Sequence, residues 1–232
     1  MKQKIVIGIT DCGKYPNYEK WILTEPDVEV IRLGHGQNNF DEIEKCDGIV
    51  LTGGEDVNPN RYNRPEYLKY CDQEDMDEKR DEFEWNVLEY TQQNKVPLLA
   101  ICRGLQIGNV FFGGSLIPDL PSFGGKDHAK IEGNDRYHDV EVIGNSLLSA
   151  ITGSQSGEVN SAHHQSADRI GDGLMVNAVS EDGVVEGLER QFPEGKPFLL
   201  MVQWHPERMT NRESTFTRNV KSAFLDQVRK GK

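Results

Sequence analysis

The chain has 232 residues, of which 36% are hydrophobic and 28% charged, and we expect residues 1–232 to form a single globular domain. The formal net charge of −12 argues against a nucleic-acid partner, because such binding depends on Lys and Arg that neutralise phosphates. No apolar run approaches the ~20 residues of a membrane helix, and the amino-terminal segment lacks the apolar region of a signal peptide, so we expect a cytoplasmic protein without a membrane partner.

The first half of the chain alternates apolar runs with polar and amphipathic stretches. The apolar runs predict buried strands at Lys4–Thr10, Val28–Leu33 and Asp47–Leu51. Asp11–Lys20 is expected to be a polar loop, and Gln73–Asn94 a long helix whose charged residues face solvent. This alternation predicts an α/β fold with a mostly parallel central sheet flanked by helices. Ligands of such sheets bind at the carboxyl ends of the strands.

A sharp strand-to-helix turn is predicted around Cys102. Pro97–Ile101 is an apolar run short enough for a buried strand, and the residues after Cys102 have helical spacing of their apolar side chains. Such a turn presents a nucleophile at the edge of the sheet, and the helix N-terminus favours a thiolate. The Arg103 N–H would point to where an oxyanion forms. The alternative is a buried structural cysteine, since free Cys often packs as a small hydrophobic residue.

A glycine pair, Gly53-Gly54, directly follows the expected strand Asp47–Leu51. Without a Cβ, a glycine lets a backbone N–H approach a ligand closely. An ordinary turn is the alternative for such a pair taken alone. Beside a reactive cysteine, we interpret it as the source of a second oxyanion donor.

The second half of the chain shows shorter strands. His138–Ile143 alternates like a strand, and Met175–Val179 and Val184–Leu188 predict a hairpin across a Glu-Asp-Gly turn. Phe198–Gln203 is a further apolar strand, and an amphipathic helix is expected at about Thr215–Arg229. We therefore expect a small antiparallel excursion within the second half of the fold.

His205 follows an apolar strand, as Cys102 does, so two strand ends of one sheet could bring these residues together. The imidazole could then take the thiol proton and return it to a leaving group. Glu207 lies two residues further on, beyond a proline that bends the chain, and could orient and stabilise the imidazole. The alternative is a hydrogen-bonded structural histidine. The three residue types together favour a catalytic triad.

The cysteine pattern gives no sign of a metal site. The four cysteines are Cys12, Cys46, Cys71 and Cys102, and none has zinc-site spacing to a second Cys or to a His. In a cytosolic chain we expect reduced thiols.

The adjacent pair His163 and His164 is the other candidate for metal binding, but no carboxylate or thiol spacing supports it. Because the two are neighbours, at most one points into a given pocket. We expect no metal, and a polar substrate-binding role for this pair.

Four motifs in order resemble the class I glutamine amidotransferase domain, and more closely the gamma-glutamyl-gamma-aminobutyrate hydrolase family (peptidase family C26). They are LTGGEDVNP at Leu51–Pro59, ICRGLQIGNVFFGGSLIPDL at Ile101–Leu120, VNSAHHQ at Val159–Gln165 and VQWHPE at Val202–Glu207. Two further segments fit, RDEFEWNVL at Arg80–Leu88 and DGVVEGLE at Asp182–Glu189. The resemblance implies the flavodoxin-like fold of class I glutamine amidotransferases.

The resemblance also implies roles for individual residues. The implied triad is Cys102, His205 and Glu207, and the implied oxyanion donors are Gly53, Gly54 and Arg103. The implied substrate-binding residues are Gln106, His164 and Gln165. Hydrolysis would pass through a gamma-glutamyl thioester on Cys102, and no metal or organic cofactor is implied.

The chain departs from the family pattern before Gly48. The family usually has a tyrosine-bearing helix there, whereas this chain has YPNYEKWILTEPDVEVIRLG at Tyr15–Gly34. This segment should border the leaving-group side of the site.

Three functions compete at this point. The first is a stand-alone hydrolase that cleaves a small gamma-glutamyl amine into glutamate and an amine. The second is a glutaminase subunit that delivers ammonia to a separate synthase partner. The third is a binding protein without catalysis, against which the intact triad residues argue. A homodimer is compatible with the sequence.

Overall fold

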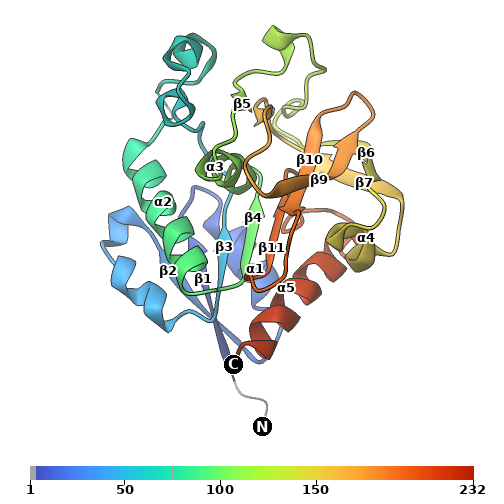
Figure 1. The fold of residues 1–232 in the computed structure, drawn as a ribbon. Helices are drawn as coiled ribbons and strands as arrows, with labels where there is room; N and C mark the ends of the chain where they lie inside the picture. The colour runs from blue at the N-terminus through green and yellow to red at the C-terminus, as the bar shows by residue number, and fades with distance from the viewer. Residues whose placement is uncertain (1–3, 75) are drawn as a thin grey trace.

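A mixed nine-stranded sheet forms the centre of the computed structural model, which describes residues 4–74 and 76–232 (Figure 1). The strand order is β2-β1-β3-β4-β11-β10-β9-β6-β7. The strands are β1 (Ile5–Thr10), β2 (Val28–Leu33), β3 (Gly48–Leu51), β4 (Leu98–Ile101), β5 (Leu116–Ile117), β6 (Arg136–Val142), β7 (Ser156–Ser161), β8 (Ser166–Ala167), β9 (Leu174–Ser180), β10 (Val185–Arg190) and β11 (Leu199–Val202). The α-helices are α1 (Tyr15–Ile22), α2 (Glu78–Gln93), α3 (Arg103–Phe111), α4 (Leu147–Thr152) and α5 (Arg218–Lys230). Short 3₁₀ turns are η1 (His35–Gln37), η2 (Phe40–Lys45), η3 (Pro59–Tyr62), η4 (Pro65–Tyr70) and η5 (Pro121–Phe123).

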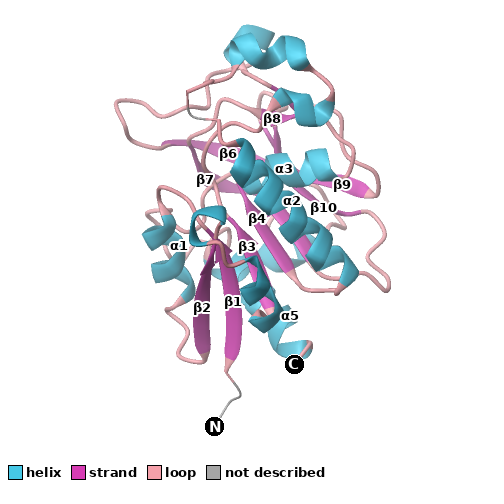
Figure 2. Cartoon of the chain, turned by 90° about the vertical axis from the view of Figure 1, so that its left-hand side faces the viewer, coloured by secondary structure: helices cyan, strands magenta, loops and turns pink. Residues whose placement is uncertain are grey.

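The parallel half of the sheet sets the position of the predicted nucleophile. Strands β2, β1, β3, β4 and β11 all run parallel, as Figure 2 shows for β1 to β4. Leu51 pairs with Ala100, and Ile101 pairs with Val202, so β3, β4 and β11 end at the same level. The residues that follow these three strands therefore meet at one edge of the sheet.

Side chains alternate between the two faces of these strands and build two apolar cores. Leu98 and Ala100 of β4 pack under α2 and α3, while Leu99 and Ile101 pack on the opposite face with α5. All four are fully buried. Because both faces are covered by helices, the parallel strands are uniformly apolar, as the sequence suggests.

The antiparallel half extends the same sheet. β10 pairs with β11, β9 with β10, β6 with β9 and β7 with β6, all antiparallel. β5 and β8 form a separate two-stranded pair. The expected fold class, a central sheet with a parallel part flanked by helices and an antiparallel excursion, is confirmed.

Two expectations about the first half are wrong. Asp11–Lys20 is not a polar loop throughout, because Tyr15–Ile22 forms α1, with Pro16 in its first turn, where proline suits a helix. This helix carries two tyrosines, Tyr15 and Tyr18. The long helix begins at Glu78, later than expected, and residue 75 of the expected range lies outside the described residues.

The charged residues of α2 are also not all solvated. Arg80, Asp81 and Glu84 are buried, and they form ion pairs with two charged residues outside the helix, Glu55 and Arg103. Within residues 4–74 and 76–232, no helix has the length and apolar character needed to cross a membrane.

Candidate active site

Cys102 lies at the turn between β4 and α3, as the sequence predicts. Its backbone has φ 54° and ψ −108°, in the left-handed half of conformational space. Its N–H donates to the Val202 carbonyl at 2.8 Å, which ties the turn to β11. The thiol therefore lies at the N-terminus of α3, where the helix dipole favours a negative charge.

His205 and Glu207 follow β11 and form a buried pair. His205 Nδ1 lies 2.9 Å from Glu207 Oε1, so Nε2 is the nitrogen left to exchange a proton with a thiol. The His205 N–H donates to Asn160 Oδ1 at 3.0 Å, and this bond fixes the backbone of the loop. Burial disfavours the charged imidazole, but the negative charges of Glu207 and Cys102 outweigh burial and raise the pKa of His205 to about 9.

A cavity of about 450 Å³ brings the predicted residues together. Cys102, His205, Gly53 and Gly54 all line it. The other lining residues are Cys12, Gly13, Lys14, Tyr18, Glu55, Lys130, Ala162 and Arg208. A small polar molecule could reach the thiol, the imidazole and the glycine turn at the same time.

The Gly53-Gly54 turn approaches the cysteine closely. A Cβ on Gly53 would lie 2.8 Å from His205 Cε1 and 3.4 Å from Cys102 Cβ, so only glycine fits. The Gly53 N–H donates to Tyr18 Oη at 2.9 Å and is therefore already engaged. The Gly54 N–H has no acceptor among the described residues, and the Arg103 N–H stands at the first position of α3. Gly54 and Arg103 are thus better placed than Gly53 as donors to an oxyanion.

Tyr18 is a residue of this site that sequence reasoning did not assign. It is fully buried on α1, and its Oη lies 3.5 Å from His205 Nδ1 as well as beside the Gly53 N–H. Burial raises the pKa of Tyr18 well above its usual range, so the hydroxyl stays protonated. The YPNY segment carried the signal, because proline in a first turn marks a helix start.

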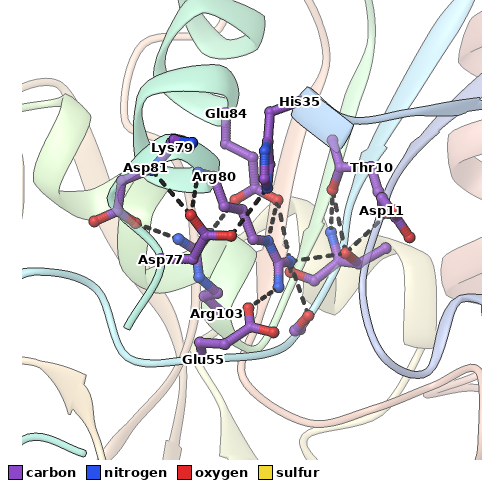
Figure 3. A network of polar contacts seen from close by, with 12 residues as sticks. Thr10, Asp11, His35, Glu55, Asp77, Lys79, Arg80, Asp81, Glu84 and Arg103 are labelled. Atoms are coloured by element: carbon purple, nitrogen blue, oxygen red, sulfur yellow. Dashed lines mark hydrogen bonds and ion pairs between the residues drawn. The ribbon is translucent and has the colours of Figure 1, made fainter. Parts of the chain in front are cut away.

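A buried network of ion pairs connects the Gly53-Gly54 turn to Arg103 at the start of α3 (Figure 3). Arg80 donates to the Gly53 carbonyl at 2.9 Å and to Thr52 Oγ1 at 3.0 Å, and pairs with Glu55 and Glu84. Arg103 pairs with Glu84 and, at its other nitrogen, with Asp81. Glu84 therefore links the residue after the cysteine to the residue that holds the glycine turn.

The residues expected to bind substrate lie away from the cavity lining in the described structure. Gln106 is buried and donates to the Gln165 carbonyl at 3.1 Å and to Gln203 Oε1 at 3.4 Å. Gln203 in turn directs its Nε2 to Cys102 Sγ at 3.5 Å. His164 lies between two carboxylates, those of Asp56 and Asp119, whose hydrogen bonds raise the pKa of its imidazole to about 9. Direct contact of these residues with substrate stays a prediction.

Comparison with known proteins assigns a family. The sequence profile of the Peptidase C26 family matches residues 30–207. The chain belongs to the Peptidase C26 family. Membership agrees with the resemblance seen in the sequence motifs and indicates a hydrolase or an amidase.

Individual relatives agree with this assignment. A Schizosaccharomyces pombe protein with the provisional name of a glutamine amidotransferase is 38% identical over 168 residues, 72% of this chain and 64% of that protein. Gamma-glutamyl-gamma-aminobutyrate hydrolase PuuD of Escherichia coli strain K12 is 35% identical over 176 residues, 71% of this chain and 65% of that protein. The chain thus spans slightly less than two thirds of both relatives.

Among solved structures, a glutamine amidotransferase from Thermotoga maritima has a TM-score of 0.63 and 18% identity, covering 98% of this chain and 85% of that one. At 18% identity, this similarity is evidence for a shared fold alone. This C26 member therefore has the architecture of a glutamine amidotransferase.

Proposed function

We propose that the protein hydrolyses the gamma-glutamyl amide bond of a small gamma-glutamyl amine through a thioester on Cys102, with His205 and Glu207 completing the triad. The observation that carries the proposal is the single cavity lined by both Cys102 and His205, with Glu207 2.9 Å from the imidazole.

The chemistry runs in two steps. The Cys102 thiolate attacks the amide carbonyl, and the His205 imidazolium gives its proton to the nitrogen of the leaving amine as the C–N bond breaks. Water then attacks the thioester and passes a proton to the imidazole, which releases glutamate and restores the thiolate. Glu207 stabilises the imidazolium and holds its orientation in both steps.

Oxyanion stabilisation fits the backbone around the cysteine. Both tetrahedral intermediates carry a negative oxygen, which backbone N–H groups stabilise in a water-poor site. The Gly54 and Arg103 N–H groups are the donors we assign. Gly53 contributes through its shape, because the absence of a Cβ leaves room between the thiol and the imidazole.

Charge and space support a gamma-glutamyl amine as substrate. Lys14 and Lys130 line the cavity, and among the described residues neither has an ion-pair partner, so both are available to a substrate carboxylate. A second cavity of about 310 Å³ shares Cys12, Gly13 and Glu55 with the first. It offers room for a leaving group larger than ammonia.

The test is glutamate release from a panel of glutamine, gamma-glutamyl-gamma-aminobutyrate, other gamma-glutamyl amines and a gamma-glutamyl anilide. Cys102→Ala should abolish turnover, while Cys46→Ala, which removes a thiol outside the cavity lining, should retain it. Full activity of Cys102→Ala would remove the proposed nucleophile. Turnover of glutamine alone would instead favour a glutaminase subunit that supplies ammonia to a separate synthase.

A further inference from the structure

Three histidines and one glutamate meet in the antiparallel half of the molecule, and none of them lines the cavity of Cys102. His128 precedes β6, His138 lies on β6, His163 follows β7 and Glu186 lies on β10. Each residue offers one possible ligand atom, and these four atoms all lie within 4.8 Å of one another. His128 Nδ1, His138 Nε2 and His163 Nε2 are each 3.5 Å from Glu186 Oε1. We call these four residues the His₃Glu cluster.

The remaining ring nitrogen of each histidine is held by an oxygen. His128 Nε2 lies 3.2 Å from both Asp182 carboxylate oxygens. His138 Nδ1 lies 3.1 Å from the Asp139 carbonyl, and His163 Nδ1 lies 2.9 Å from the Gln165 carbonyl. Since a carbonyl or carboxylate oxygen only accepts, each of these nitrogens carries the hydrogen.

These hydrogen bonds fix the tautomer of all three imidazoles. In the neutral ring, the second nitrogen then presents a lone pair, and all three lone pairs face the Glu186 carboxylate. With all three rings neutral, the centre of the cluster would therefore contain acceptors alone. The three inward nitrogens and both Glu186 oxygens have no hydrogen-bond partner among the described residues.

Burial makes this arrangement costly without a cation. Glu186 is fully buried, and the His128 and His163 side chains are 5% and 2% exposed. Buried acceptors left unpaired cost free energy, and a buried carboxylate costs more. If one imidazole were protonated, it could donate a hydrogen bond to Glu186. The other two imidazoles would still direct a lone pair at the carboxylate.

We propose that the His₃Glu cluster binds one Zn²⁺ ion with tetrahedral geometry. The ligand atoms are His128 Nδ1, His138 Nε2, His163 Nε2 and one Glu186 oxygen. Zinc bound by imidazole and carboxylate at about 2.0–2.1 Å places tetrahedral ligands about 3.4 Å apart, close to the 3.5 Å between each inward nitrogen and Glu186 Oε1. Calcium and magnesium are disfavoured, because they take oxygen ligands.

The surroundings have the other features of a zinc site. The oxygen partners of the outer ring nitrogens are those that orient metal-bound histidines, with Asp182 forming a carboxylate–histidine–metal triad. A surface cavity of about 490 Å³ is lined by His128, His138 and Asp182 and gives an ion a route in from solvent. Because protein atoms supply all four ligands, the ion has a structural role.

The site would brace one wall of the cavity that holds Cys102. His163 is adjacent to Ala162, which lines that cavity. The carbonyl of Glu186 accepts from the Gln203 N–H at 2.8 Å, and the Gln203 side chain contacts the cysteine. Zinc would thus join β6, β10 and the loop after β7 next to the site. The inference does not depend on which amide the protein cleaves.

The test measures metal binding by the full chain and needs no substrate. The protein is stripped with a chelator, dialysed and titrated with Zn²⁺ against a chromophoric competitor. We expect one ion per chain, and a rise in Tm of about 5 °C or more at saturating zinc. Co²⁺ in place of Zn²⁺ should give the intense visible bands of a tetrahedral centre.

Variants assign the ligands. Asp182→Asn removes a partner of a ligand and should weaken zinc binding by ~10–100-fold. His138→Ala and Glu186→Gln each remove a ligand and should weaken zinc binding by more than that. The matched control is His164→Ala, which removes the neighbour of a ligand and should bind zinc like the wild type.

Stripped wild-type protein that binds neither ion overturns the proposal, as does unchanged zinc affinity in both ligand variants. If a ligand variant fails to fold, X-ray absorption of the zinc-loaded wild type decides. Three imidazoles around the ion support the proposal, and any other ligand set overturns it.

Discussion

The Arg80 guanidinium donates a 2.9 Å hydrogen bond to the Gly53 carbonyl, which fixes the glycine turn beside Cys102 from the buried face of α2. Because Arg80 is almost fully buried beside Glu55 and Glu84, removing its charge takes away the ion-pair partner of Glu55 and leaves Glu84 with Arg103 alone. We expect Arg80→Gln to lower the free energy of unfolding by about 3–5 kcal/mol, as for other broken buried pairs.

The same variant should lower kcat, because the turn that carries Gly54 loses its support. Denaturant unfolding and glutamate release measure the two effects. Lys79→Gln, at the exposed neighbouring position, serves as control and should change neither. An Arg80→Gln protein with wild-type kcat would show that the network is not needed to hold the turn.

The pH dependence of kcat/KM should report His205. Its pKa is raised to about 9, so the imidazolium that protonates the leaving amine is present below this pH and lost as the pH rises through it. We therefore expect kcat/KM to fall above about pH 9. Glu207→Gln removes a negative charge beside the ring and should move this fall to lower pH by about 1–3 units. A fall at the same pH in both proteins would contradict the assignment.

Thiol labelling should single out Cys102. Burial raises the pKa of Cys12, and raises the pKa of Cys46 and Cys71 to about 12, so these three remain thiols at neutral pH. Iodoacetamide at pH 7 followed by peptide mass analysis should find alkylation first at Cys102, with loss of activity at the same rate. Faster labelling of any other cysteine would count against an activated thiolate at Cys102.

The Tyr18 hydroxyl should matter for catalysis although it does no covalent chemistry. Tyr18→Phe leaves the buried Gly53 N–H without its acceptor, at a cost of about 1–3 kcal/mol, and loosens the packing beside the imidazole. We expect a lower kcat with the fold retained. Tyr15→Phe is the matched control, since its hydroxyl makes only a 3.5 Å contact with Glu19. Equal kcat values for the two variants would exclude this positioning role.

Much of the fold and the candidate site could be predicted from local sequence. The apolar runs before Gly53 and Cys102 are short, uninterrupted and followed by turn residues, so both strand ends were identifiable. The expectation for α2 was wrong, because its charged side chains were all expected to face solvent. Arg80 and Glu84 are four residues apart and pair with each other on a buried helical face, but their other partners, Glu55 and Arg103, lie on other segments.

The His₃Glu cluster could not be predicted from spacing. Its four residues come from separate segments, brought together by the antiparallel pairing of β6 with β7 and β9, and of β9 with β10. The adjacent histidines His163 and His164 point to different surroundings, one to this cluster and one to Asp56 and Asp119. The resemblance implied a substrate-binding role for His164, but nothing in the local sequence indicated that His163 would join this cluster.

The backbone of Cys102 implies a conflict between activity and stability. A non-glycine residue at φ 54° and ψ −108° stores roughly 1–3 kcal/mol of strain, which glycine would relieve. Cys102→Gly should therefore be inactive yet unfold at a higher temperature than Cys102→Ala, a comparison that differential scanning calorimetry can make. Equal melting temperatures would show that the turn is relaxed. Stability alone would favour glycine at this turn, so under the proposed function the strain at Cys102 is the cost of holding a nucleophile there.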